Sequence, residues 1–133
     1  MIFVDTGAWY ALSDSADPDH VAAIGWLSSN RESLVKSDYV LDETLTLLRR
    51  HGQDVKAVEV GRRLLDQEGV SLVHVTPEDV RETFEVFSRY RDKGWSFTDC
   101  SSYVIIRRPN LSAAFSFDQH FQQFNLVTVV PHG

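Results

Sequence analysis

The sequence predicts an α/β fold built around a mostly parallel sheet of four or five strands. Short apolar runs rich in β-branched and aromatic residues alternate with longer segments of helical period, which is typical of this fold class. Several runs are apolar almost throughout, as expected for strands covered by helices on both faces. A chain of 133 residues with 43% hydrophobic content suits a single domain over residues 1–133, and its core needs no disulfide or structural zinc.

The first predicted strand, residues 2–5, leads into a short helix that carries Trp9. Asp17 and Pro18 have the residue types of an N-cap and a first helical position, so a second helix is expected from there to about residue 30. This helix is expected to bury its apolar stripe, which consists of Val21, Ile24 and Leu27.

The middle of the chain alternates two strands with three long helices. The predicted strands are residues 34–36 and 71–75, and the predicted helices are residues 38–50, 54–68 and about 76–92. Ser37 or Asp38 is expected to cap the first of these helices. Gly69 ends the second, and Thr76 opens the third.

In the last part of the chain, Ser96 followed three residues later by Asp99 predicts a capping box and a helix that continues to Arg107. Strands are expected at residues 113–117 and 127–130, of which the second has the weaker pattern. A short helix is expected between them.

The net charge and the lengths of the apolar stretches argue against some classes of function. A net charge of −6 argues against a protein that binds nucleic acid through a broadly basic surface. Pairs such as Arg49 with Arg50 offer local phosphate contacts, although solvated helix ends are the simpler interpretation. The sequence has neither a basic leader before an apolar run nor an apolar stretch of about 18 residues. We therefore expect a cytoplasmic protein that does not enter a membrane.

Asp5 and Asp118 stand where two predicted strands end. Ligands of open parallel sheets bind beyond the carboxyl ends of the strands, so both acids are candidates for a binding site. Asp99 lies in the first turn of its predicted helix, where the helix dipole stabilises a carboxylate. Each of these acids also has a purely structural interpretation as a helix cap or dipole partner, and the pattern leaves that alternative open.

Glu43 has a weaker structural explanation. It lies too far inside its predicted helix to act as a cap, and it borders the apolar stripe beside Val40 and Leu47. A carboxylate at the edge of a buried face requires a partner, and a cation is the natural one. Mg²⁺ binds carboxylate and water oxygens, and two such ions about 4 Å apart activate water in phosphodiester cleavage. The four acids therefore predict a metal site.

Two other α/β sites do not match the sequence. A phosphoacceptor receiver domain requires paired acids after its first strand and another Asp after its third, whereas Asp5 stands alone and Thr76 and Pro77 follow the third strand. A haloacid-dehalogenase-like phosphatase requires a second acid two residues after the first, where this chain has Gly7.

Four short segments that contain the acids carry a family resemblance. In chain order they are Val-Asp-Thr-Gly at 4–7, Leu-Asp-Glu-Thr at 41–44, Ser-Phe-Thr-Asp-Cys at 96–100 and Phe-Ser-Phe-Asp-Gln-His-Phe at 115–121. Together they resemble the PIN domain family, and most of all the VapC-type toxins of toxin-antitoxin pairs. Four segments in the same order are more specific than any one of them.

The resemblance implies a three-layer α/β/α sandwich, a site for Mg²⁺ or its substitute Mn²⁺, and endoribonuclease activity. Asp5 and Asp99 would be the principal metal ligands, with Glu43 and Asp118 completing the acidic cluster directly or through water. The supporting hydroxyl positions beside these acids are Thr6 and Thr98. The implied reaction is hydrolysis of an RNA phosphodiester bond by metal-activated water.

The resemblance also implies an RNA substrate, a small antitoxin that covers the acidic cleft, and a homodimer. Two alternatives remain: a PIN nuclease of RNA processing or quality control without an antitoxin, and a degenerate PIN-like module that binds without catalysis. The intact set of four acids argues against the second. His120 is expected to form a local hydrogen bond rather than bind the metal. Trp95 is the first aromatic residue to test for stacking on RNA bases, with core packing as the simpler interpretation.

Overall fold

The computed structural model describes residues 1–66 and 69–131, in which five parallel strands form one sheet. The strands are β1 (Ile2–Val4), β2 (Leu34–Ser37), β3 (Val70–Val73), β4 (Ala113–Phe115) and β5 (Thr128–Val130). Their order is β3-β2-β1-β4-β5, so β1 is central, with β2 on one side and β4 on the other. All five predicted strands are present, which confirms the predicted fold class.

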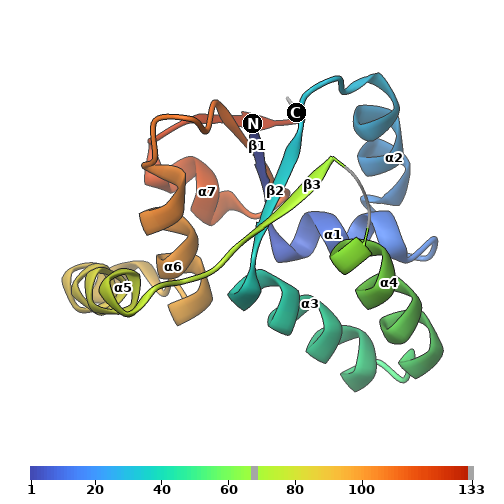
Figure 1. The fold of residues 1–133 in the computed structure, drawn as a ribbon, viewed down its shortest axis with the longest axis horizontal. Coiled ribbons are helices and arrows are strands. Elements are labelled where there is room, and N and C mark those ends of the chain that lie inside the picture. The colour runs from blue at the N-terminus through green and yellow to red at the C-terminus, as the bar shows by residue number, and fades with distance from the viewer. Residues whose placement is uncertain (67–68, 132–133) are drawn as a thin grey trace.

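Helices cover both faces of this sheet (Figure 1). Among the described residues they are α1 (Thr6–Ser13), α2 (His20–Ser29), α3 (Asp38–Arg50), α4 (Asp54–Asp66), α5 (Pro77–Arg89), α6 (Phe97–Ile106) and α7 (Gln119–Phe124). Figure 1 shows α1, α2 and α4 on one side of the sheet and α5, α6 and α7 on the other. Helix α3 leaves the end of β2 and packs against α1, α4 and α6. This is the three-layer architecture that the resemblance implied.

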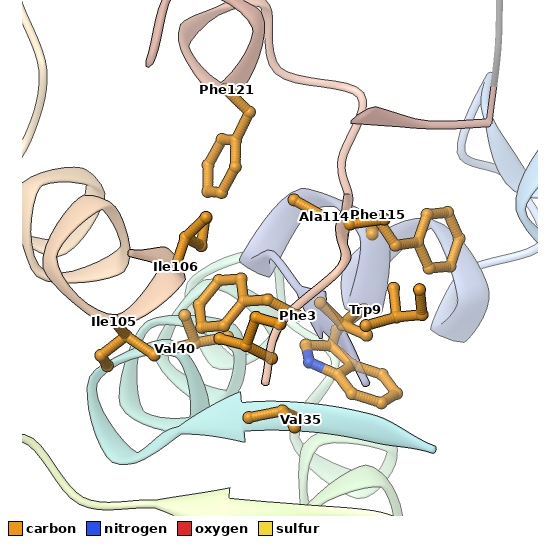
Figure 2. Close-up of a cluster of buried hydrophobic side chains, with 14 of the residues drawn as sticks. Phe3, Trp9, Val35, Val40, Ile105, Ile106, Ala114, Phe115 and Phe121 are labelled. Atoms are coloured by element: carbon orange, nitrogen blue, oxygen red, sulfur yellow. The ribbon is translucent and has the colours of Figure 1, made fainter. Parts of the chain in front are cut away.

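The core forms on both faces of the two central strands, β1 and β4 (Figure 2). Phe3 and Ala114 are register partners and point to one face, while Val4 and Phe115 point to the other. The ring of Phe3 packs on Phe121 of α7, with 6.3 Å between their centroids. Because both strands are fully buried along their length, polar chemistry is confined to the residues that follow their carboxyl ends.

Side-chain caps fix the helices that begin near this edge. The hydroxyl of Ser37 accepts a hydrogen bond from the backbone N–H of Val40 (3.0 Å) and caps α3, as predicted. Thr76 and Asp79 form a complete capping box at the start of α5. Helix α5 ends at Arg89, earlier than predicted, and a 3₁₀ turn follows at Arg91–Lys93.

Two predicted helix limits require comment. The carboxylate of Asp17 does not cap α2 but accepts a hydrogen bond from the backbone N–H of Asp19 (2.8 Å) within a turn, so the helix begins at His20. The prediction that Asp17 is the N-cap was therefore wrong. The predicted end of α4 at Glu68 lies outside the described residues.

The buried face of α2 was also predicted wrongly. Val21 is 83% exposed, and Ile24 and Leu27 are exposed as well. The helix packs instead through Ala23 and through Trp26, whose ring centroid lies 4.2 Å from that of Phe115. An indole buries more apolar area than a branched aliphatic side chain, so packing Trp26 turns the aliphatic stripe toward solvent.

Trp95 belongs to the core. It is buried, its indole N–H donates a hydrogen bond to the side-chain oxygen of Gln123 (3.0 Å), and its ring packs edge-on against Phe124. Stacking of this indole on RNA is therefore not supported. No helix in residues 1–66 or 69–131 is long and apolar enough to cross a membrane.

Candidate metal centre

Asp5 directly follows the central strand β1, at the carboxyl edge of the sheet. It occupies the N-cap position of α1, yet its carboxylate accepts no capping hydrogen bond within the described residues. The side chain is almost completely buried, with 5% of the residue exposed. The structural interpretation of Asp5 as a helix cap therefore fails, and its carboxylate is available for another partner.

The topology explains why Asp5 and Asp118 meet. The chain leaves β1 toward β2 on one side and later returns to β4 on the other, so the carboxyl ends of β1 and β4 form the switch point of the sheet, where open α/β sheets have a crevice that binds ligands. Ser116, just after β4, bridges the two acids. Its hydroxyl donates to Oδ2 of Asp5 (3.1 Å) and accepts from the backbone N–H of Asp118 (3.0 Å).

Asp99 enters the same crevice from the first turn of α6. Its backbone N–H donates to the hydroxyl of Ser96 (3.0 Å), and its Oδ2 accepts from the backbone N–H of Ser96 (3.1 Å), which is the predicted capping box. Within the described chain, Oδ1 of Asp99 has no hydrogen-bond partner. One oxygen of this carboxylate thus holds the side chain in place and the other remains open.

His120, in the first turn of α7, lies between two of the acids. Its Nδ1 is 3.0 Å from Oδ2 of Asp99 and 3.4 Å from Oδ1 of Asp118. One donor atom from each of these three residues lies within 4.8 Å of the others. The ring was expected to hydrogen-bond locally, but its hydrogen bond within the described residues goes to Asp99 on another helix, a contact that the sequence did not predict. The Asp118-x-His120 spacing was the available signal.

The side chains of the other predicted site residues, Glu43, Thr6 and Thr98, form no hydrogen bond or ion pair with the three aspartates within the described chain. Glu43 is half-buried on α3, which packs against α1 and α6, but none of the described residues forms a hydrogen bond or ion pair with its carboxylate. The hydroxyl of Thr6 is buried and lacks a hydrogen-bond partner in the described chain. Thr98 is half-buried, and its carbonyl accepts a hydrogen bond from the hydroxyl of Ser101 (2.6 Å).

Burial and charge repulsion dominate the electrostatics of the crevice. Burial, followed by the negative charge of Asp99, raises the pKa of the Asp5 carboxyl to about 7, and Asp118 adds a smaller contribution. Hydrogen bonds from Thr6 and Ser116 only partly oppose this shift. The Asp5 carboxyl is therefore only partly ionised at neutral pH, and a nearby positive charge would favour its ionised form.

The residues fit a divalent cation. Oxygens of Asp99 and Asp118 lie within 4.8 Å of each other, and both acids are close enough to Asp5 for their charges to raise its pKa, although Asp5 lies outside that closest group. In residues 1–66 and 69–131 no Lys or Arg forms an ion pair with any of the three. The unpartnered buried hydroxyl of Thr6 is a further oxygen beside Asp5. Hard divalent cations prefer this kind of oxygen-rich donor set.

The adjacent cysteine plays no part in this chemistry. Cys100 is buried, and burial together with the charge of Asp99 raises the pKa of its thiol to about 11. The thiol therefore stays protonated at neutral pH and is a poor nucleophile.

Comparison with known proteins gives consistent relatives. A family model described as the PIN domain matches residues 2–126. The 23S rRNA-specific endonuclease VapC20 of Mycobacterium tuberculosis is 33% identical over 132 residues, which cover 98% of this chain and 99% of that protein. The VapC ribonuclease of Archaeoglobus fulgidus is 29% identical over 123 residues, covering 89% of this chain and 77% of its own.

Solved structures agree in fold. The crystal structure of M. tuberculosis VapC20, described as a Sarcin-Ricin loop cleaving toxin, superposes with a TM-score of 0.90 at 31% identity and covers 98% of this chain and 100% of that one. FitAcB from Neisseria gonorrhoeae has a TM-score of 0.71 at 14% identity, covering 98% of this chain and 97% of that one, which is a likeness of fold alone.

Proposed function

Because this chain belongs to the PIN domain family, we propose that it is a divalent-metal-dependent endoribonuclease and the toxin component of a toxin-antitoxin pair. The observation that carries the proposal is the proximity of the carboxylates of Asp5, Asp99 and Asp118, none of which is paired to a Lys or Arg in the described residues. Repulsion among buried carboxylates is relieved when a divalent cation binds.

We assign the metal to Asp5, Asp99 and Asp118, with Glu43 completing the acidic set from α3. Mg²⁺ is the expected ion and Mn²⁺ its substitute. When bound, the cation makes a water more acidic and neutralises charge on the phosphate. The hydroxyl of Thr6 and the Thr98 position are assigned supporting roles beside the ligands.

Hydrogen bonds within the chain hold the proposed ligands in place. Ser116 holds Asp5 and Asp118 in fixed relative positions, and the capping box holds Asp99. The side chain of Asp118 is 38% exposed, more than that of Asp99. We infer that RNA approaches from the Asp118 side, while burial keeps bulk water away from Asp5.

The substrate proposal follows the relatives. VapC20 is named a 23S rRNA-specific endonuclease, so a looped ribosomal RNA is the first substrate to test on this chain. Such a substrate and the activity that cuts it would meet in the cytoplasm.

Two partners complete the proposal. A small antitoxin is expected to cover the acidic crevice and to bury the groove of about 290 Å³ between α1, α2 and α4, whose lining includes the exposed Ile24 and Leu27. A second copy of the chain is expected against α5, where Phe84 is 57% exposed and Phe87 is exposed as well. In a PIN nuclease without an antitoxin, the groove between α1, α2 and α4 would stay uncovered.

The deciding experiment is cleavage of a ribosomal RNA loop by the purified protein. We expect cleavage with Mg²⁺ or Mn²⁺, none with EDTA, and a loss of at least about 100-fold in rate for Asp5→Asn. The matched control is Asp42→Asn, an exposed acid next to Glu43, which should cleave normally. Equal cleavage by the Asp5→Asn protein would contradict the proposed site.

A further inference from the structure

The position of His120 suggests more than a local hydrogen bond. Its Nδ1 approaches two carboxylate oxygens from different elements, Oδ2 of Asp99 at 3.0 Å and Oδ1 of Asp118 at 3.4 Å. A ring that served only to orient one acid would need one such contact. Here a single atom, Nδ1, lies close to carboxylate oxygens of both acids.

The structure holds this ring firmly. The backbone N–H of His120 donates to Oδ1 of Asp118 (2.9 Å), which fixes the first turn of α7. The next residue, Phe121, is buried and packs on Phe3 of the central strand. These contacts fix the turn of α7 from which the imidazole projects toward the two acids.

The spacing of the donor atoms matches that of neighbouring ligands on one ion. Donor atoms about 2.1 Å from an octahedral metal lie about 3 Å from each other, close to the separations of Nδ1 from both oxygens. From these separations, and resting on the proposed nuclease function, we propose that Nδ1 of His120 is a direct ligand of the divalent cation together with Asp99 and Asp118.

A nitrogen ligand changes the metal preference of the site. Mg²⁺ takes oxygen ligands almost exclusively, whereas imidazole suits transition metals, and affinity rises from Mn²⁺ toward later ions. The site is therefore a mixed oxygen and nitrogen site that binds Mn²⁺ more tightly than Mg²⁺, and the difference depends on His120.

The protein offers a matched control in His74. Its Nδ1 lies 3.3 Å from Oδ2 of Asp38, a similar histidine and aspartate pair, but it is largely exposed and has no second carboxylate within ion-pair distance in the described chain. Substituting His74 thus removes a histidine contact of the same kind without touching the crevice.

The test is the nitrogen hyperfine coupling of bound Mn²⁺, measured by pulsed electron paramagnetic resonance on protein with ¹⁵N-labelled histidine rings. We expect a histidine coupling in the unchanged protein and in His74→Gln, and none in His120→Gln. Mn²⁺ bound without histidine coupling in the unchanged protein would overturn the assignment, as would a coupling that survives in His120→Gln.

Calorimetry gives a second measurement that does not depend on activity. We expect His120→Gln to weaken Mn²⁺ binding by about tenfold or more and Mg²⁺ binding by less than about threefold. Equal losses for both ions would mean that His120 acts only through the carboxylates. RNA cleavage without histidine coupling would overturn this inference and leave the nuclease proposal intact, whereas failure of both ions to bind would overturn both.

Discussion

Asp5 links the stability of the protein to pH. Its carboxyl has a pKa of about 7 in the folded chain, against an ordinary value of 3.8. Between these values the folded state binds more protons than the unfolded state, so stability of the metal-free protein falls as pH rises through this window. The effect is at most about 4 kcal/mol, for a shift of about three pKa units.

Asp5→Asn removes the ionisable carboxyl, so it should remove this loss of stability at high pH. In EDTA, we expect the variant to have a melting temperature at pH 8 at least about 5 °C above that of the unchanged protein, and a smaller difference at pH 4. Thermal denaturation across that pH range measures both. Asp42→Asn should follow the unchanged protein, and a parallel pH dependence for Asp5→Asn would show that the carboxyl of Asp5 is not the group responsible.

Lys36 is a second buried ionisable residue, and it lies on β2. The residue is only 1% exposed, its ammonium forms no hydrogen bond or ion pair with residues 1–66 or 69–131, and burial lowers its pKa. Because the folded pKa is depressed, the destabilisation is fully present at neutral pH and is relieved as pH rises toward 10.5.

We expect Lys36→Met to stabilise the protein at pH 7 by about 1 kcal/mol, because an ammonium that is disfavoured by desolvation is replaced by an apolar chain of similar length. Urea denaturation measures the change. The control Lys93→Met, at an exposed position, should change the free energy of unfolding by less than about 0.5 kcal/mol. A destabilised Lys36→Met protein would indicate an ionic partner for the ammonium.

Strand positions alone predicted that Asp5 and Asp118 lie together, because the ends of parallel strands share one edge of the sheet. The bridging hydroxyl of Ser116 was not predictable, since its direction depends on the pairing of β4 with β1. The contact of His120 with Asp99 depends on how α7 packs against α6, which no local pattern encodes.

Among the helices, α5 and α6 both begin with a capping box, but the two boxes differ in what else their residues do. Thr76 with Asp79 caps α5, and Ser96 with Asp99 caps α6, but only the second box contains a proposed metal ligand. We expect Thr76→Ala and Ser96→Ala each to destabilise the protein by about 1 kcal/mol. Only Ser96→Ala should also weaken Mn²⁺ binding, because the lost hydroxyl accepts from the backbone N–H of Asp99 and its removal loosens the helical turn that carries this acid.

Calorimetry on both variants separates capping from ligand positioning. Similar Mn²⁺ affinities in the two variants would show that the hydroxyl of Ser96 does not position Asp99. The loss of stability, measured by denaturation, is the internal check that each cap has been removed.

The strands were predictable because their composition differs sharply from that of their surroundings. The buried face of α2 was not, since either of its two faces could have packed on the sheet. Trp26 stacks on Phe115, a residue distant in the sequence, and this contact exposes Ile24 and Leu27. The choice between two apolar faces is made by the surface that receives the helix.

At the scale of the whole molecule, that exposed face provides a test of the proposed antitoxin. We expect Ile24→Asp with Leu27→Asp to abolish binding of the proposed antitoxin, while RNA cleavage persists. Co-purification measures the binding. Val55→Asp, at an exposed position of α4 that does not line the groove, should bind normally, and normal binding by the double variant would place the antitoxin elsewhere.

The aromatic face of α5 provides a separate test of the proposed homodimer. Phe84 projects into solvent, and Phe87 packs edge-on against Phe97 with 5.7 Å between centroids. Phe84→Asp should shift the mass in sedimentation equilibrium toward one chain, because it puts a charge into the expected interface. Val55→Asp should not, and a dimer that survives Phe84→Asp would locate the contact outside α5.

The pairing of β1 with β4 sets an order of events during synthesis. Ile2 has Ala113 as its register partner. Strand β1 can therefore pair with β4 only after most of the polypeptide has been synthesised. Until residues 113–118 have left the ribosome, a growing chain carries Asp5 without Ser116 or Asp118. A nascent chain therefore lacks part of the proposed metal site, and the complete acidic set forms only after this segment has emerged.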